Sequence, residues 1–284
     1  MKNKKKRKIW NLVIILLAAV GSILLLYPSA NFWFSQRVQS YAVQKYDDGI
    51  EKMNAEQLEA EWEQAVTYNK GLSSYAADPF AAGSLELSEE YLAVLNINED
   101  GIMGHIKIPS INVRLPIYHG TSEEVLNKGA GHLSGSNLPI GGEGNHAVLT
   151  GHTGLTTAKL FTDLAKMEVG ETFYIVILDR TLAYKVEQIL VVEPSETEAL
   201  RAVEGEDYVT LVTCTPYGIN SHRLFVRGTR IPFTEEDEKK LETKAELTIN
   251  WKMVMISLFA IAMSVVFVRH KIRKRRRCRK DQPV

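Results

Sequence analysis

Hydrophobic residues form three patterns along this chain: a long apolar run near each end, helical spacing after the first run, and short alternating segments in between. The long runs are Ile9 to Tyr27 and Ile249 to Val268, and both are almost uncharged. Each approaches the ~20 apolar residues that a helix needs to cross a bilayer. Trp10 and Trp251 lie near the run ends, where interfacial aromatic residues concentrate. The pattern predicts one membrane helix near each end of the chain.

The segment from Asn31 to Leu72 is predicted to be helical. Asn54 and Gln57 have the capping-box spacing that opens a second helix within it. Apolar residues at helical spacing, Trp62 among them, line one face of that helix. The sequence does not decide whether these helices pack on the rest of the protein or form a stalk. Residues 71–90 are predicted to form a loop.

From Leu92 onward the apolar spacing changes to short extended segments, which turn residues such as Asp100-Gly101 and His119-Gly120 separate. Short strands at this spacing are typical of a closed or sandwiched β domain. The expected strands are 92–97, 102–108, 113–118, 147–151, 172–178, 182–192, 208–214 and 223–231.

Brief helices are expected between these strands at 123–127, 159–164 and 195–201. The last one opens with Ser195-Glu196-Thr197-Glu198, a second capping-box pattern. Residues 232–246 are highly charged, and we expect them to form a solvated helical connector to the second apolar run.

The charges of the chain are segregated, although its formal net charge is zero. Six of the first eight residues are Lys or Arg, and nine more lie between Arg269 and Lys280. Between Pro28 and Asn250 there are 18 Lys and Arg against 33 Asp and Glu, a net charge of −15. Because Lys and Arg collect on the cytoplasmic side of a membrane, both ends are expected inside and the acidic middle outside. This predicts a two-span protein of the cell membrane whose partners include the lipid bilayer.

A cleaved signal peptide is the alternative for the first apolar run, since Pro28-Ser29-Ala30 would permit cleavage. The run is long for a signal peptide, which favours a retained anchor. The middle of the chain is exported in either case. Its acidic charge argues against nucleic acid as a partner, because phosphate binding needs a basic surface.

Cys214 is the only cysteine of the exported middle, because Cys278 lies in the basic tail. A lone thiol outside the cell is exposed to oxidation, which indicates that it is either deeply buried or used. It ends an expected strand, and Thr215-Pro216 then stops the ladder. Successive side chains of a strand point to opposite faces, and Arg223 lies on one face of the next expected strand. A thiol and a guanidinium on neighbouring strand ends are a candidate site for thiol chemistry.

A thiol acts as a nucleophile only when a nearby cation or base favours its thiolate. His152 has the best context for that base, because it follows the expected strand 147–151 and functional groups concentrate at strand ends. His222 is disfavoured, because its side chain should point to the face opposite Arg223. The six candidates in the exported middle are His105, His119, His132, His146, His152 and His222.

The sequence gives little support for a metal site or for a serine nucleophile. A single cysteine among scattered histidines does not supply the closely spaced ligands of a zinc site, and no cofactor is expected. No Gly-x-Ser-x-Gly motif is present, and the serines after Gly131 lie in a turn-rich loop without a nucleophile elbow.

Three separated motifs resemble those of sortases, the membrane-anchored cysteine transpeptidases of Gram-positive bacteria. Residues 210–214, Thr-Leu-Val-Thr-Cys, resemble the TLxTC signature. Residues 149–155 resemble the segment with the catalytic histidine, and residues 220–228 resemble the strand with the essential arginine. The similarity covers roughly residues 92–232. It implies an eight-stranded β-barrel with short helices, which makes the protein mainly β.

The resemblance implies His152, Cys214 and Arg223 as catalytic residues. Cys214 would attack an LPxTG-like sorting signal between Thr and Gly and form a thioacyl enzyme. His152 would act as general acid and then as general base. Arg223 would hydrogen-bond the developing oxyanion or the substrate carbonyls.

Two further features resemble class C sortases, which polymerise pilins through a pilin lysine amine. The first is Asp78-Pro79-Phe80, which resembles the Asp-Pro-aromatic motif of their lid loop. In that case Asp78 pairs with Arg223 and Phe80 packs over Cys214; otherwise the segment is a linker whose Phe80 fills a surface gap. The second feature is the apolar run near the C-terminus, which resembles their second membrane span.

Two other functions stay open: a housekeeping sortase that anchors surface proteins to peptidoglycan, and a non-catalytic pilus or surface scaffold with Cys214 in its core. The predicted organisation has six parts. They are a basic end with an N-terminal anchor or signal at 1–30, a helical segment and lid loop at 31–90, a catalytic barrel at 91–233, a charged connector at 234–248, a membrane helix at 249–268 and a basic tail at 269–284.

Overall fold

The computed structural model describes residues 2–72, 87–155 and 157–242, together with residues 255, 256, 259, 262, 263 and 266. The chain divides into two compact units, residues 1–34 with 247–284 and residues 35–246. Within the described part of the chain, none of the helices combines the length and the apolar content that crossing a bilayer requires. The two predicted spans, 9–27 and 249–268, are therefore not confirmed.

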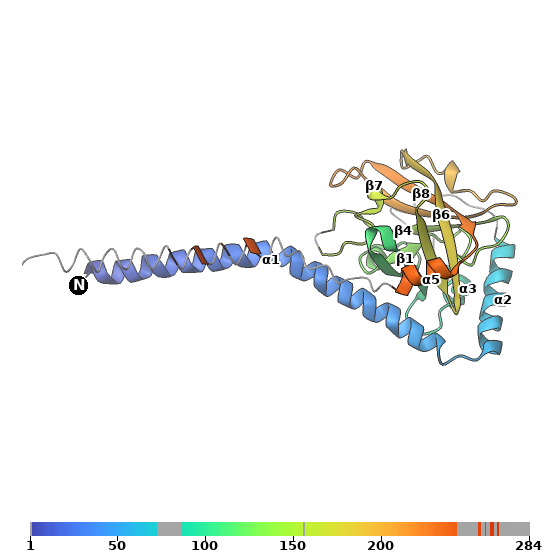
Figure 1. The fold of residues 1–284 in the computed structure, drawn as a ribbon, viewed down its shortest axis with the longest axis horizontal. Helices are drawn as coiled ribbons and strands as arrows, with labels where there is room; N and C mark the ends of the chain where they lie inside the picture. The colour runs from blue at the N-terminus through green and yellow to red at the C-terminus, as the bar shows by residue number, and fades with distance from the viewer. Residues whose placement is uncertain are drawn as a thin grey trace, which may run out of the picture. The chain divides into compact units, whose positions relative to one another are not determined.

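The second unit is built around a closed barrel of eight strands in the order β1-β2-β3-β4-β7-β8-β6-β5 (Figure 1). The predicted mainly-β, eight-stranded architecture is thereby confirmed. Two neighbouring pairs, β2 with β3 and β4 with β7, are parallel, and the other pairs are antiparallel. The strands are β1 (Ile102–Ile108), β2 (Val113–His119), β3 (Ala130–His132), β4 (Asn145–Thr150), β5 (Thr172–Ile177), β6 (Arg180–Val192), β7 (Asp207–Thr215) and β8 (His222–Ile231).

Strands β4, β7 and β8 are buried on both faces, which explains their nearly continuous apolar sequences. One face of each contributes to the main core inside the barrel, for example with Leu149, Leu211 and Leu224. The alternate residues contribute to a second cluster on the other face, which includes Val148 and Val212. Strands that are covered on both sides hold the residues at their ends in fixed positions.

The helical segment that precedes the barrel packs against it, which answers the question that the sequence leaves open. Tyr46, near the end of α1 (Lys2–Ile50), is fully buried. Its hydroxyl donates to the Met103 carbonyl at 3.1 Å and accepts from the Leu178 amide at 2.8 Å. The residues of α1 from Ser35 onward and α2 are therefore part of the barrel unit and do not form a stalk.

The predicted capping box of the second helix is confirmed, because Asn54 and Gln57 each bond the other's backbone amide. After α2 (Ala55–Gly71), which has 17 residues, the helices of the second unit are short. They are α3 (Glu89–Ala93), α4 (Glu123–Leu126) and α5 (Glu235–Glu242), with 3-10 turns η1 (Pro109–Ile111), η2 (Leu164–Lys166) and η3 (Glu198–Leu200).

One predicted strand is wrong and one strand was missed. Residues 92–97 do not form a strand; α3 occupies their first part, and Leu95 turns the chain with a φ of 60°. The eighth strand is β3, a stretch of three residues in the segment predicted as a loop. It is too short to show alternation, and its pairing with β2 and β4 defines it.

Other local predictions shift or fail because tertiary contacts override the local pattern. The helix expected at 159–164 is a turn followed by η2. The second capping box is absent: η3 begins after Thr197, whose side chain makes no capping bond. The connector is helical in α5, but it is not wholly solvated, because Asp237 is buried and accepts the Tyr174 hydroxyl at 2.7 Å.

Candidate active site

Strand register aligns three of the predicted site residues in one row. Strands β4 and β7 pair in parallel, from Asn145 beside Asp207 to Thr150 beside Val212. The alignment continues past the strand end, because the Gly151 amide donates to the Val212 carbonyl at 3.0 Å. The next residue, His152, therefore lies just beyond the end of β4, beside the end of β7 that holds Cys214.

Arg223 completes the row from the other side of β7. It is the direct antiparallel partner of Cys214 on β8. Its Nη1 donates to the Cys214 sulfur at 3.6 Å, and the same nitrogen lies 3.4 Å from the carbonyl oxygens of Asn220 and His222. Arg223 is only 8% exposed, so its charge acts with little screening by water. A guanidinium in this position stabilises negative charge on the sulfur or on an oxygen beside it.

The threonine before the nucleophile candidate has a structural role. Thr213 is buried, and its hydroxyl donates to the Gly151 carbonyl at 2.7 Å. This bond connects the backbone just before His152 with the residue just before Cys214. It gives a physical reason for a threonine at this place in the Thr-Leu-Val-Thr-Cys stretch.

Glu123 lies close to His152 and was missed by the sequence analysis. Its Oε2 is 3.4 Å from Nε2 of His152. Glu123 begins α4, which Ser122 caps, and α4 packs near β3. The helix itself was predicted, but its position beside His152 depends on β3, which was not. A carboxylate at this distance can orient the imidazole.

His222 points away from this row, as the alternation along β8 predicts. Its Nε2 lies 3.2 Å from a Glu193 oxygen, and its Nδ1 is 2.8 Å from the Ser221 hydroxyl. The side chain is 40% exposed. His222 is therefore not positioned to exchange a proton with the Cys214 sulfur.

The other four candidate histidines are buried structural residues. Burial lowers the pKa of His132 to about 4 and that of His146 to about 4. Burial also lowers the pKa of His105 and His119. These four side chains stay neutral near pH 7 and belong to the packing of the barrel.

A buried polar network surrounds Tyr91 of α3. The Tyr91 hydroxyl lies 2.8 Å from Nδ1 of His132 and accepts the Gly120 amide at 3.0 Å. Nε2 of His132 in turn donates to the Asn137 carbonyl at 2.8 Å. The network connects α3 with β3 and with the end of β2. Strand β3 in turn contacts α4, the helix that contains Glu123.

The predicted lid residues Asp78, Pro79 and Phe80 lie outside the described residues. Among the residues that the structure does describe, no group of three or more His, Cys, Asp or Glu side chains could hold a metal ion.

Comparison with known proteins gives consistent matches. Residues 106–231 match the family model described as the Sortase domain. Sortase A of Bacillus anthracis is 28% identical over 223 residues, which cover 78% of this chain and 95% of that protein.

Solved structures are more similar. Sortase C-1 of Streptococcus pneumoniae is 45% identical, with a TM-score of 0.65 over 68% of this chain and 100% of that one. Sortase C-1 of Actinomyces oris is 48% identical, with a TM-score of 0.60 over 63% of this chain and 99% of that one.

Proposed function

Because this chain belongs to the sortase family of cysteine transpeptidases, and within it to class C, we propose that it polymerises pilins. The substrate is a surface protein with an LPxTG-like sorting signal, which is cut between Thr and Gly. The acceptor is the side-chain amine of a pilin lysine, so the product is an isopeptide bond. The solved structure of Streptococcus pneumoniae sortase C, 45% identical to this chain, is described as giving insight into pilin substrate specificity, which supports this choice.

The observation that carries the proposal is the Cys214–Arg223 contact at 3.6 Å, in register with His152. The Cys214 thiolate attacks the threonine carbonyl carbon, and the carbonyl electrons move onto the oxygen. Arg223 donates to that oxyanion, where a charge-assisted hydrogen bond in a sheltered site is most effective. When the tetrahedral intermediate collapses, the C–N bond breaks and a thioacyl enzyme remains.

His152 moves the protons of both half-reactions. As imidazolium it protonates the departing glycine amine, and as neutral imidazole it then takes a proton from the incoming lysine amine. The amine adds to the thioester carbonyl and the Cys214 thiolate leaves, so the enzyme returns to its starting state. Glu123, whose Oε2 lies 3.4 Å from Nε2 of His152, holds the ring in place from the side of α4.

The lid and the membrane topology complete the proposal. Asp78 and Phe80 cover Arg223 and Cys214 until a protein substrate displaces them, which favours a lysine amine over water as acceptor. The runs 9–27 and 249–268 anchor the enzyme, with the barrel on the outer face of the membrane. The charge pattern, basic at both ends and −15 in the middle, supports this orientation.

A housekeeping sortase, which anchors surface proteins to peptidoglycan, is the second candidate. Its support is the match to Sortase A of Bacillus anthracis, which extends over 95% of that protein at 28% identity. The higher identity to the sortase C structures, up to 48%, favours pilin polymerisation.

One experiment tests the proposal. The purified full chain, with Asp78→Ala to open the lid, is incubated with an LPxTG peptide and a pilin domain, and the products are mapped by mass spectrometry. We expect a peptide adduct on Cys214 and then a peptide linked to a pilin lysine. Cys214→Ala should give neither and should still fold, because a small, half-buried thiol loses little volume on truncation. A parallel reaction contains a peptidoglycan peptide amine in place of the pilin domain, and transfer to that amine alone would support the housekeeping candidate. Transfer by Cys214→Ala would refute the mechanism.

A further inference from the structure

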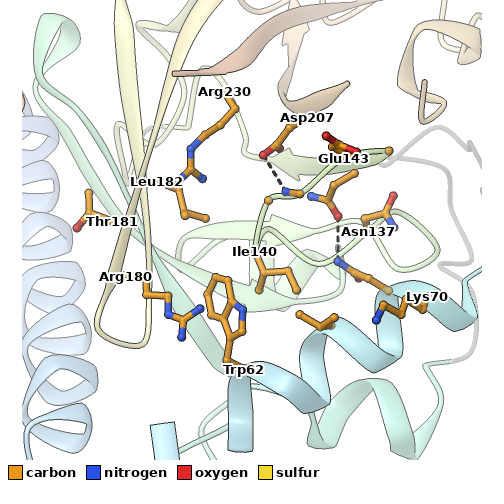
Figure 2. Close-up of a pocket in the computed structure, with 16 residues that line it drawn as sticks. Trp62, Lys70, Asn137, Ile140, Glu143, Arg180, Thr181, Leu182, Asp207 and Arg230 are labelled. Carbon is orange, nitrogen blue, oxygen red and sulfur yellow. Dashed lines mark hydrogen bonds between the residues drawn. The ribbon is translucent and has the colours of Figure 1, made fainter. Parts of the chain in front are cut away.

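The two ends of β7 and β8 are built differently. At one end, Figure 2 shows a cavity of about 750 Å³ beside Trp62 of α2, with Asp207 and Arg230 in its lining. Asp207 is seven positions along β7 from Cys214, or about 23 Å at ~3.3 Å per residue. The lining carries charges of both signs, which favours neither an anionic nor a cationic ligand. At the other end, next to the sulfur, the loop 216–221 connects the two strands.

The loop 216–221 has a closely defined backbone. Two of its residues are in the left-handed conformation: Gly218 has a φ of 76° and Asn220 a φ of 60°. The amides of Ile219 and Asn220 both donate to the Pro216 carbonyl, at 3.0 Å and 2.9 Å. Because these bonds close the turn, the loop itself fixes the direction of the chain at Asn220.

The left-handed conformation of Asn220 gives its two backbone groups different partners. Its amide faces back into the loop, and its carbonyl accepts Nη1 of Arg223 at 3.4 Å. A second carbonyl at that nitrogen, also at 3.4 Å, belongs to His222, whose backbone is paired with β7. Strand pairing therefore fixes the His222 carbonyl, whereas the Asn220 carbonyl depends on the conformation of the loop.

The side chain of Asn220 takes no part in this arrangement. It is exposed, and within the part of the chain that the structure describes it makes no hydrogen bond. Asparagine adopts the left-handed conformation more readily than most residues, whereas alanine resists it and a β-branched residue such as valine resists it strongly. The position therefore requires a backbone conformation and not an amide group.

The Asn220 carbonyl contributes to the aim of the guanidinium. Nη1 of Arg223 donates to this carbonyl, to the His222 carbonyl and to the Cys214 sulfur, the last at 3.6 Å. A change of backbone conformation at Asn220 would turn its carbonyl away and remove one of these bonds. The guanidinium could then move toward water, where its charge favours the Cys214 thiolate less.

We propose that Asn220 is a positioning residue for Arg223. Its left-handed backbone directs the carbonyl that helps to keep Nη1 beside the Cys214 sulfur. The inference rests on the proposed function only in that Cys214 is the nucleophile. It holds whether the acceptor is a pilin lysine or a peptidoglycan amine.

The alkylation rate of Cys214 tests the proposal without any substrate. The full chain in detergent micelles, with Cys278→Ser so that one thiol remains, reacts with iodoacetamide from about pH 5 to about pH 9, and intact-protein mass spectrometry gives the rate. We expect Asn220→Val to react about fivefold more slowly at neutral pH, with its pH profile displaced upward, and Asn220→Ala to be intermediate. Asn220→Gly should match the parent, because glycine adopts a φ of 60° freely.

Glu99→Val is the matched control. Glu99 is exposed and has a φ of 54°, so the substitution makes the same demand on the backbone. It precedes β1, which three strands separate from β7 in either direction around the barrel. Glu99→Val should therefore leave the alkylation rate and its pH profile at the parent values.

An Arg223→Ala background shows whether Asn220 acts through the guanidinium. There Asn220→Val should have no further effect on alkylation, because the group that it releases is absent. Equal slowing with and without Arg223, parent-like alkylation of Asn220→Val, or alkylation of Asn220→Gly as slow as that of Asn220→Val would overturn the proposal. If Asn220→Val does not fold, Asn220→Ala takes its place under the same criteria. Absence of peptide transfer in the parent would count against the proposed function alone.

Discussion

Nη1 of Arg223 donates to the Cys214 sulfur at 3.6 Å, and the two residues are direct partners across β7 and β8. Because the two residues are paired across neighbouring strands, the backbone fixes the distance between the guanidinium and the sulfur. No flexible loop is needed to bring them together. The same nitrogen lies near two backbone carbonyls, which limits how far the guanidinium can turn. The strand pairing of the barrel thus places the guanidinium where the proposed mechanism needs it.

Arg223→Lys should therefore reduce thioacyl formation strongly. A lysine keeps the charge but lacks the planar fork, and loss of one oxyanion donor typically costs about 100-fold or more in rate. Single-turnover formation of the Cys214 adduct measures the effect. Arg227→Lys is the matched control, because Arg227 lies on the same strand and pairs with Glu187 at 2.8 Å. Equal losses in both variants would show that the strand, and not the Cys214 contact, is responsible.

The neighbouring positions of Cys214 and Arg223 can be predicted from the sequence, because the two strands follow each other along the chain. Their alternation and the turn between them are local features. The alignment of His152 with Cys214 is different, since β4 and β7 are parallel and 62 positions apart in their register. No local pattern encodes that pairing, and His152 was selected by its place at a strand end and by family resemblance.

The parts that the sequence analysis missed depend on long-range contacts. Strand β3 has three residues, too few for a periodic signal, and Glu123 reaches His152 only because β3 pairs with β2 and β4. The cavity beside Trp62 is assembled from α2, a glycine-rich loop and three strands. Residues so far apart in sequence give no sign of a shared site.

The proposed lid predicts how Cys214 reacts with small reagents. Asp78→Ala and Phe80→Ala should each raise the alkylation rate of Cys214 by a thiol reagent, because a covered sulfur becomes accessible. Intact-protein mass spectrometry at timed intervals measures the rate. Glu86→Ala, a substitution in the same predicted loop outside the Asp-Pro-aromatic motif, serves as the control. Unchanged labelling in both lid variants would indicate a linker instead.

Glu123 is expected to position His152. Its Oε2 lies 3.4 Å from the imidazole Nε2, and its side chain is 76% exposed, so we expect a loss of a few-fold in kcat for Glu123→Ala. Glu123→Gln should recover most of the rate, because an amide of the same shape still limits how the imidazole can turn. Glu124→Ala is the control, since Glu124 pairs with Lys128 on the same helix. A Glu123→Gln variant as slow as Glu123→Ala would mean that the carboxylate charge, and not its position, matters.

Tyr91→Phe should destabilise the barrel without touching the row at the sulfur. The substitution leaves the Gly120 amide and Nδ1 of His132 without their buried partner, at a cost of about 1–3 kcal/mol for each unsatisfied group. Urea denaturation measures the loss. Tyr68→Phe is the control, because within the described residues its hydroxyl makes no hydrogen bond, and we expect a change below about 0.5 kcal/mol. Equal stability of the two variants would contradict the role of the Tyr91 network.

The buried histidines predict how stability depends on pH. Burial lowers the pKa of His132 to about 4 and that of His146 to about 4, against 6.5 for an unperturbed histidine. Between pH 6.5 and 4 the unfolded chain therefore binds protons that the folded barrel does not, so these residues reduce stability as the pH falls. Above pH 6.5 both states are neutral at these positions, and the effect ends.

The slope of this dependence is the measurable quantity. Each histidine contributes at most about 1.4 kcal/mol of lost stability per pH unit. In the neutral form His146 donates from Nδ1 to the Arg201 carbonyl at 2.8 Å, and Nε2 lies 2.7 Å from the Thr210 hydroxyl. His146→Gln removes this titration and should flatten the slope of unfolding free energy between pH 6 and pH 4.5, although it lowers stability at pH 7.5. The same slope in the variant and the parent would show that His146 takes up its proton in the folded barrel, because then its folded and unfolded pKa values do not differ.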